Sequence, residues 1–350
     1  MNIKELFQTA VMKKASDLHL LVGSPPVLRI DGNLVDINKK ELNQKELEQM
    51  IFSILNETQK EKFTRKRDFD FSYTPDNKNR FRVNLHYGRN STGLVARVIS
   101  ETMPSLEEIM MPDIMYKLLD INQGLILVTG PTGCGKSTSL AAMIEYINKK
   151  RRCNIVTLED PIEFIFKPSK SIIIQRELGT DITSFKSGLK HALRQDPNVI
   201  MVGEMRDLET ISATITLAET GHLVLATLHT YSANQTIDRI IDIFPPYQQN
   251  QIRMQLSMTL AAIISQRLIP KIKGGRVAAR EFLLNTHAVA NLIRENKIAQ
   301  IKTVIETSAK DGMISLDQCL KGLYKNKIIS KEIAQLNMNN PELLEKYKIF

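Results

Sequence analysis

Residues 130–137 read Gly-Pro-Thr-Gly-Cys-Gly-Lys-Ser, and this stretch decides the fold. Its spacing is G-x-x-x-x-G-K-[ST], the pattern of a loop whose backbone N–H groups turn inward around phosphate oxygens. The apolar run Leu125–Thr129 directly before it predicts a buried strand, and Thr138–Ile147 directly after it predicts a helix. This loop requires a strand before it and a helix after it, so the sequence predicts a phosphate-binding site.

The residues of this loop have separate expected roles. The N-terminus of the following helix adds its dipole to the anion site, Lys136 is expected to reach the β- and γ-phosphates, and the Ser137 hydroxyl is expected to bind Mg²⁺. Cys134 is interpreted as a small filler of the loop. The alternative, a glycine turn with only a structural role, requires the loop pattern and both flanking elements to match by chance. The predicted binding set is Gly130, Pro131, Thr132, Gly133, Cys134, Gly135, Lys136, Ser137 and Thr138.

Around the loop, short apolar strands alternate with helices. Strands are predicted at Asn154–Leu158, Asn198–Val202 and His222–Leu228, and helices at Phe185–Leu193 and Leu208–Ala218. Continuous apolar strands separated by helices predict an α/β fold with a parallel sheet that is covered on both faces. From about residue 245 onward, the chain is expected to be mainly helical.

The first hundred residues predict a smaller α+β domain. Residues 41–63 carry apolar side chains at helical spacing, and residues 69–73, 81–87 and 94–99 predict strands. These strands are expected to be antiparallel neighbours with one face in water.

A domain boundary is predicted after this region. Ser105 and Glu108 form a capping box that is expected to open a new helix. The predicted organisation is an N-terminal domain over residues 1–100, a linker over 101–112, a core over 113–270 and a mainly helical region over 271–350.

Composition excludes several classes of protein. The 350 residues are 43% hydrophobic and 24% charged, which is typical of a globular chain. No apolar run reaches the roughly 18–20 residues of a membrane helix, and no signal peptide is predicted. Three widely spaced cysteines exclude a disulfide framework and a CxxC zinc site.

The net charge of +9 is uneven along the chain. Residues 271–350 hold 14 basic and 8 acidic residues, a net charge of +6. This surplus is interpreted as a docking face for an acidic partner, with a solvated helical surface as the alternative.

Two strand ends carry candidate catalytic carboxylates. Glu204 follows the apolar strand Asn198–Val202, and Glu159, Asp160 and Glu163 follow the strand Asn154–Leu158. In α/β sheets ligands collect at the carboxyl ends of strands, so these groups are expected to face the phosphate loop. Gly203 stands directly before Glu204, so contact between Glu204 and Mg²⁺ is expected to run through water. The alternative is that these residues are helix caps or solvated loop charges.

Two histidines flank a predicted strand. His222 and His229 are seven residues apart, so they do not share one face of a regular strand, and this argues against a metal site. His229, at the carboxyl end, is a candidate sensor of the γ-phosphate. His222 is interpreted as a bridge between strands or subunits.

Longer stretches resemble one family. Residues 157–164 (TLEDPIEF), 192–207 (ALRQDPNVIMVGEMRD) and 220–230 (TGHLVLATLHT) resemble the Asp box, Walker B motif and His box of the secretion-type ATPases, which are hexameric motors of type II secretion and type IV pili. The resemblance runs nearly end to end, with further matches at residues 15–20, 80–84, 263–266 and 275–279.

This resemblance implies a fold, cofactors and a site. The fold is a PAS-like N-terminal domain before a RecA-like core, the cofactors are ATP and Mg²⁺, and the assembly is a homohexamer. Glu204 and Glu163 would position water and metal. Arg82 and Arg97 are the candidates that complete a neighbouring subunit's site in trans, with Arg80 and Arg194 behind them.

Within the family, the chain is most similar to the retraction motors of type IV pili. Residues 291–296 (NLIREN) and 312–320 (GMISLDQCL) resemble their C-terminal region, and neither an extra N-terminal domain nor a four-cysteine zinc site is predicted. The implied protein is a cytoplasmic ATPase, peripheral at the inner face of the cytoplasmic membrane, that powers pilus retraction and twitching motility. Its implied partners are an inner-membrane pilus platform protein and a paralogous retraction ATPase. One position departs from the pattern, because retraction motors usually read Ala-Ile-Arg where this chain has Ala288-Val289-Ala290, so an accessory retraction motor stays open.

Other functions are weighed against this one. A pilus-assembly or type II secretion ATPase is the nearest alternative. A nucleic-acid translocase shares the RecA-like core, but the chain has no Trp and only 6% aromatic residues for base stacking, so no nucleic-acid partner is expected. A non-hydrolysing ring subunit is disfavoured because Lys136, Glu163 and Glu204 are all present.

Overall fold

The computed structural model describes residues 2–30, 32–76, 79–99 and 103–345 of the chain. The packing of the backbone divides the chain into two compact units. The first consists of residues 1–102 with 161–165, and the second of residues 103–160 with 166–350. Each unit has its own sheet and core.

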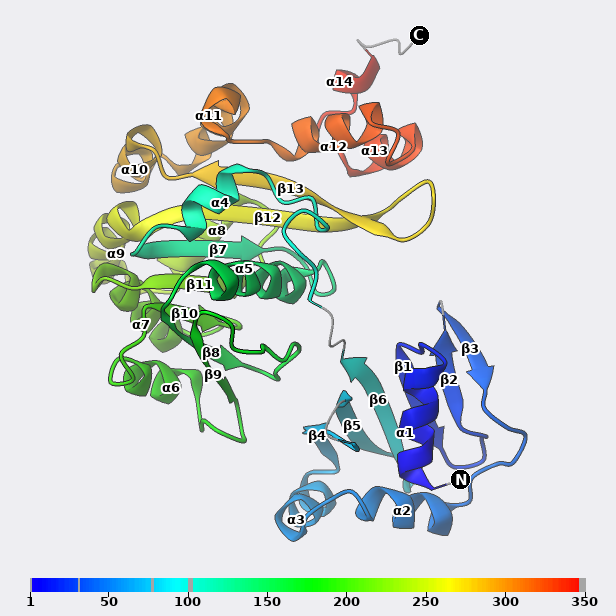
Figure 1. Ribbon diagram of the computed structural model, residues 1–350. Coiled ribbons are helices and arrows are strands. Elements are labelled where there is room, and N and C mark those ends of the chain that lie inside the picture. Colours follow the sequence, from blue (N-terminus) through cyan, green and yellow to red (C-terminus); the bar gives the residue numbers. More distant parts are fainter. Residues whose placement is uncertain (1, 31, 77–78, 100–102, 346–350) are drawn as a thin grey trace. The chain divides into compact units, whose positions relative to one another are not determined.

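The first unit is built on a six-stranded antiparallel sheet in the order β3-β2-β1-β6-β5-β4 (Figure 1). Along β5, Phe81, Val83 and Leu85 are buried while Arg82 is exposed, so one face of the sheet forms the core and the other faces water. The strands are β1 (Asp17–Leu21), β2 (Val27–Ile30), β3 (Asn33–Asp36), β4 (Asp68–Tyr73), β5 (Arg80–Gly88) and β6 (Ser91–Ile99). The three predicted antiparallel neighbours are confirmed as β4, β5 and β6.

Helices cover the apolar face of this sheet. They are α1 (Ile3–Met12), α2 (Gln44–Phe52) and α3 (Glu57–Lys66), and they contribute Phe7, Leu47 and Phe63 to the core. The apolar spacing over residues 41–63 belongs to two helices, not one. The Asn56 side chain accepts a hydrogen bond from the Gln59 backbone and begins α3 as an N-cap.

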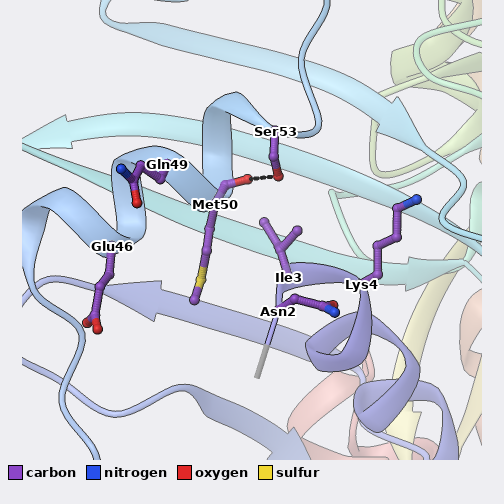
Figure 2. A pocket seen from close by; sticks show the side chains of 7 residues that line it. All are labelled: Asn2, Ile3, Lys4, Glu46, Gln49, Met50 and Ser53. Carbon is purple, nitrogen blue, oxygen red and sulfur yellow. Dashed lines mark hydrogen bonds between the residues drawn. The ribbon is translucent and has the colours of Figure 1, made fainter.

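A surface pocket lies where the start of α1 meets α2, and it is lined by residues 2–4, Glu46, Gln49, Met50 and Ser53 (Figure 2). Its polar groups serve the fold locally. Asn2 caps α1, and Glu46 accepts from the Asn43 backbone and pairs with Lys40 at 2.7 Å. This lining has no constellation that indicates chemistry.

The second unit is built on a seven-stranded sheet in the order β13-β12-β7-β11-β10-β8-β9. All neighbours are parallel except the edge pair β12 and β13. The strands are β7 (Gly124–Thr129), β8 (Asn154–Glu159), β9 (Ile172–Glu177), β10 (Val199–Val202), β11 (Leu223–Leu228), β12 (Leu260–Pro270) and β13 (Arg276–Leu284). Every residue of β7, β10 and β11 is buried, as expected for strands covered on both faces. The predicted α/β fold with a parallel sheet is confirmed.

Helices pack on both faces of this sheet (Figure 1). On β7, Leu125 and Leu127 join a core that includes α6, α7, α8 and α9, while Ile126 and Val128 point to the opposite face, where α5 packs. The helices are α4 (Ile114–Leu119), α5 (Lys136–Lys150), α6 (Phe185–Ala192), α7 (Leu208–Glu219), α8 (Ala233–Asp242), α9 (Pro246–Thr259), α10 (His287–Arg294), η1 (Ile298–Gln300), α11 (Ile301–Thr307), η2 (Ala309–Asp311), α12 (Leu316–Lys325), α13 (Lys331–Asn337) and α14 (Glu342–Glu345). Among the described residues, no helix combines the length and apolarity needed to cross a membrane.

One expectation about this unit is incomplete and another is wrong. Helices predominate from residue 245 onward, as the sequence predicts, but Leu260–Pro270 and Arg276–Leu284 form a hairpin of β12 and β13 that the sequence did not predict. The apolar run of β12 pairs in parallel with β7 and becomes an interior strand of the sheet.

The capping box of Ser105 and Glu108 is present, but it does not open a helix. It closes one turn that ends at Met111. Met110 takes the left-handed conformation with φ 54°, which stops the helical backbone.

Candidate active site

The loop at residues 130–135 connects β7 to α5, as the sequence predicts. Gly130 has φ 143°, and a Cβ there would lie 2.2 Å from the Gln266 backbone oxygen. Gly135 is the N-cap of α5 with φ 87°. Only glycine fits both positions, because one is sterically closed and both have positive φ. The loop therefore places its backbone N–H groups at the start of a 15-residue helix, where an anion is favoured.

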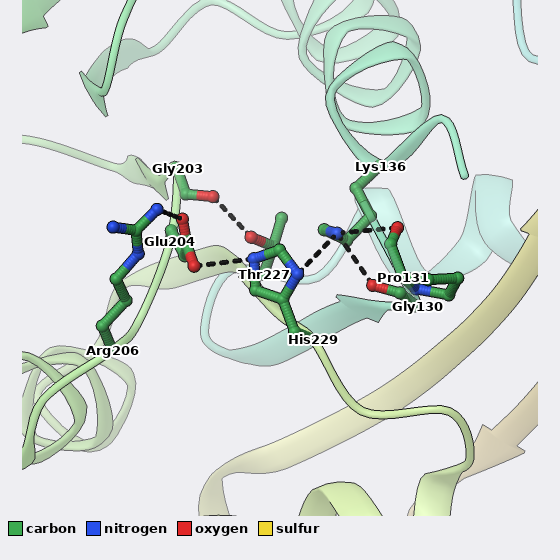
Figure 3. Close-up of polar contacts among 8 residues, drawn as sticks. All are labelled: Gly130, Pro131, Lys136, Gly203, Glu204, Arg206, Thr227 and His229. Carbon is green, nitrogen blue, oxygen red and sulfur yellow. Dashed lines mark hydrogen bonds and ion pairs between the residues drawn. The ribbon is translucent and has the colours of Figure 1, made fainter. Parts of the chain in front are cut away.

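Lys136 lies over the loop that precedes it (Figure 3). Its Nζ donates to the Gly130 oxygen at 2.8 Å and to the Pro131 oxygen at 3.2 Å. The same nitrogen is 3.5 Å from Nδ1 of His229. Lys136 thus connects the phosphate loop with the end of β11.

Glu204 is held just beyond the end of β10 by the neighbouring strand β11. The Thr227 hydroxyl donates to the Gly203 oxygen, and the Met205 N–H donates to the Thr227 oxygen at 3.1 Å. A Cβ at Gly203 would lie 3.1 Å from the Leu158 oxygen, so glycine lets this loop pack closely on β8. These contacts fix the backbone on both sides of Glu204.

Both carboxylate oxygens of Glu204 are engaged (Figure 3). One is 2.7 Å from Nε2 of His229 and the other is 2.7 Å from Nη2 of Arg206. Burial alone would raise the pKa of Glu204, but the hydrogen bond from Arg206 and the charge of His229 outweigh it, and the pKa is lowered. Glu204 is therefore ionised at neutral pH.

This arrangement favours positioning over proton abstraction. A general base works best with a pKa near the operating pH, whereas the pKa of Glu204 lies below its ordinary value. A fixed, ionised carboxylate is suited to orienting water or a hydrated cation. His229 lies between this carboxylate and Lys136, so the three side chains form a continuous polar row across the carboxyl ends of β7, β11 and β10.

The donor set fits a magnesium site of the kind completed by phosphate oxygens. Ser137 lies in the first turn of α5, half-buried beside Lys136. In the described part of the chain, no cluster of three or more His, Cys, Asp or Glu side chains is arranged to hold a metal. Mg²⁺ needs no such cage, because it keeps several waters and binds substrate phosphates with one or two protein oxygens.

Other predicted site residues are placed differently. Glu163 is exposed in residues 161–165, which group with the first unit. Glu159 is 6% exposed and accepts hydrogen bonds from Thr157 at 2.6 Å and Gln175 at 3.0 Å, so it ties β8 to β9. The structure thus brings Glu204 and His229 to the phosphate loop, whereas the hydrogen bonds of Glu159 join neighbouring strands of the sheet.

The remaining predicted residues lie on loops and on the first unit. Arg82 and Arg97 are exposed on the first unit's sheet. His222 lies at the amino end of β11, where its ring contacts the Leu217 oxygen at 3.0 Å. Cys134 is 3% exposed, and burial raises the pKa of its thiol, in keeping with a filler of the loop.

Three contributors escaped sequence reasoning. Arg206 and Thr227 lie within motif stretches but carry no signal of pairing by themselves. Gln266 donates to the Cys134 oxygen at 2.9 Å and accepts from the Ser139 hydroxyl at 3.0 Å. It comes more than a hundred residues later in the sequence, so no local pattern places it under the loop.

The fold and the loop together define a P-loop α/β protein with the secretion-ATPase fold. The chain belongs to the type II/IV secretion system protein family, whose model matches residues 1–290.

Individual relatives in this family match nearly end to end. The type IV pilus retraction ATPase PilT of Pseudomonas aeruginosa is 46% identical, over 98% of this chain and 99% of its own. The type IV pilus ATPase PilU of the same organism is 41% identical, over 95% of this chain and 88% of its own. A crystal structure of the pilus retraction motor PilT with bound ADP superposes with a TM-score of 0.92 at 44% identity, covering 99% of this chain and all of that one.

Proposed function

We propose that this chain is an ATPase that powers the retraction of type IV pili as a cytoplasmic ring of six copies. The observation that carries the proposal is the row Lys136–His229–Glu204 beside an intact phosphate loop, in a chain 46% identical over its length to a retraction ATPase. The substrate is ATP with Mg²⁺.

Each side chain of the row has a separate task in hydrolysis. The loop N–H groups and Lys136 bind the phosphates, and Ser137 with a water held by Glu204 would hold Mg²⁺, which neutralises charge that develops on the phosphate oxygens. The ionised Glu204 orients the attacking water, and Arg206 keeps the carboxylate in place. His229 touches both Lys136 and Glu204, so it is placed to sense the terminal phosphate. Glu163 is proposed as a second carboxylate that positions water and metal.

The first unit supplies candidate arginines for a neighbouring subunit. Arg82 and Arg97 are directly opposite each other on β5 and β6, and both are exposed. Arg97 pairs with Asp17 at 2.9 Å, yet its side chain is 69% exposed. Like charges directly opposite on a sheet are destabilising. This arrangement supports an anionic partner for the two arginines. We propose that this partner is the nucleotide bound to the next subunit, so that Arg82 and Arg97 complete that subunit's site in trans.

Hydrolysis and the trans arrangement are tested by subunit mixing. Lys136→Ala is expected to abolish ATP hydrolysis, because the loop loses its cation. Arg82→Ala alone is expected to lower turnover sharply, and mixing it with Lys136→Ala subunits is expected to restore part of the activity. Arg65→Ala, an exposed arginine on α3, is the matched control. Mixed rings that stay inactive would refute the placement of Arg82, and normal turnover by Lys136→Ala would refute the loop assignment.

The cellular role is tested by deletion. Loss of the gene is expected to leave surplus surface pili and abolish twitching motility, whereas cells without pili would indicate an assembly motor. A peripheral position at the inner membrane, docked on a pilus platform protein, is part of this proposal. The basic residues 271–350 are the proposed docking face.

The choice between a main and an accessory retraction motor rests on Ala290. It lies on α10 and is 8% exposed. If Ala290→Arg increases retraction in cells that lack the paralogous motor, the chain acts in the accessory role. Unchanged retraction supports a main motor that does without this arginine.

A further inference from the structure

Arg280 on β13 is a buried cation in the second unit, away from the row of Lys136, His229 and Glu204. It is 4% exposed. Its Nη1 donates to the Ile109 oxygen at 2.8 Å and to the Met110 oxygen at 3.1 Å, and its Nε donates to Oε1 of Gln266 at 3.4 Å. Burial lowers the pKa of Arg280 to about 10, so the side chain stays charged at neutral pH. A buried charge held by neutral oxygens is a costly arrangement for stability alone.

On one side, Arg280 holds the turn over residues 105–111. This turn is closed by backbone bonds from Met110 to Glu107 and from Met111 to Leu106, both at 2.9 Å. Its last carbonyls are the ones that Arg280 binds, and a cation at the C-terminal end of a helical turn is favoured by the peptide dipoles. In the sequence this turn is the first hydrogen-bonded element of the second unit, which begins at residue 103.

On the other side, Arg280 holds Gln266, its register partner on β12. Gln266 is 1% exposed. Its amide nitrogen donates to the Cys134 oxygen inside the phosphate loop, and its amide oxygen accepts from the Ser139 hydroxyl in α5. The Gln266 backbone oxygen closes the space beside Gly130. A shift of Gln266 is therefore a shift of the loop.

We propose that Arg280 is a positioning residue that couples the turn over residues 105–111 to the phosphate loop through Gln266. A displacement of the turn changes nucleotide affinity without contact between the turn and the nucleotide. The inference rests on the proposed function only in taking a nucleotide as the ligand of the loop. Arginine is required because its planar guanidinium donates to the turn carbonyls and to Gln266 at the same time, whereas the ammonium of lysine is a point charge.

The test is a double-mutant cycle read out as affinity for a fluorescent ADP analogue. Arg280→Met is expected to weaken binding roughly two- to thirtyfold, the range for residues that couple distant sites. The pair Ser105→Ala with Glu108→Ala, which loosens the turn at its capping box, is expected to weaken binding when Arg280 is present and to have no further effect in Arg280→Met. Arg276→Met, exposed at the start of the same strand, is the matched control and is expected to bind normally.

Folding is controlled separately. If Arg280→Met does not fold, Arg280→Lys replaces it, because lysine keeps the charge but does not span the turn and Gln266. Equal loss of affinity from the turn variants in both backgrounds, or no loss in the wild-type background, would overturn the coupling. Failure of the wild-type chain to bind the ADP analogue at all would contradict the proposed function instead, so the two failures are distinguishable.

Discussion

Glu204→Gln removes one charge and almost no volume from the candidate active site. In the wild-type chain the carboxylate touches His229 and Arg206, each at 2.7 Å. Its backbone is fixed independently, by the contacts of Gly203 and Met205 with Thr227. The substitution therefore leaves the loop in place and removes only the fixed negative charge.

The two consequences of the substitution differ in size. Arg206 and His229 are 72% and 44% exposed, so each ion pair contributes about 0–1 kcal/mol to the free energy of unfolding. The expected loss of stability is thus at most about 2 kcal/mol. Loss of a preorganised group that orients water typically lowers kcat by about 10²–10³-fold. Glu204→Gln should therefore be a folded, nucleotide-binding and nearly inactive protein.

The assay is steady-state phosphate release with Mg²⁺ and ATP, together with thermal unfolding and binding of a fluorescent ADP analogue. Nucleotide affinity is expected to stay within about threefold of wild type, because binding depends on the loop and Lys136. Glu209→Gln is the matched control, since Glu209 lies in the first turn of α7 and its side chain is 52% exposed. A kcat within a few fold of wild type in a folded Glu204→Gln would refute the role of this carboxylate. A large loss of stability would indicate that Glu204 serves to stabilise the fold and not to orient water.

Three further outcomes are expected. Gly130→Ala should destabilise the chain by about 3 kcal/mol or more, because the new Cβ would meet the rigid Gln266 backbone oxygen. Gly133→Ala should lose only about 1–2 kcal/mol through its positive φ, because a Cβ there has nothing within 4 Å. Equal thermal shifts of the two variants would contradict this reasoning. The lowered pKa of Glu204 contributes stability above pH 4.5, its ordinary pKa, and this contribution is lost as the pH falls through the folded value. In urea titrations, the stability difference between wild type and Glu204→Gln should therefore shrink as the pH falls below about 5; a difference that grows as the pH falls through this acid range would be inconsistent. The Cys134 thiol, whose pKa burial raises, should be alkylated far more slowly in the native chain than in urea, as mass spectrometry of its peptide would show; equal rates would mean that the loop is open.

Sequence reasoning succeeded where the signal is local. The apolar runs of β7, β10 and β11 and the glycine loop between β7 and α5 depend on residues within about a dozen positions of one another. Parallel strands that are buried on both faces are continuous apolar runs, so they are visible without knowledge of their neighbours. The strands β12 and β13 were not predicted, because an apolar run does not by itself distinguish a buried helix from a buried strand.

Candidate site residues divide in the same way. Lys136 is predicted by the spacing of the phosphate-loop pattern, and Glu204 and His229 are predicted by their positions at strand ends. Residue type alone did not separate the buried Glu159, which accepts from Thr157 and Gln175, from Glu204, which faces the loop. That difference depends on which neighbouring strand supplies a partner.

The sequence by itself determined that this chain has a phosphate loop in a parallel α/β sheet and which residues end its strands. Only the tertiary structure decided that Glu204 pairs with His229 and Arg206. It also decided that Gln266 donates to the Cys134 oxygen of the loop and that Arg280 donates to Gln266. The physical reason is strand order. β12 lies beside β7, and Ser265 meets Thr129 across 136 residues of sequence. Such contacts depend on how the whole sheet assembles, and no local periodicity encodes them.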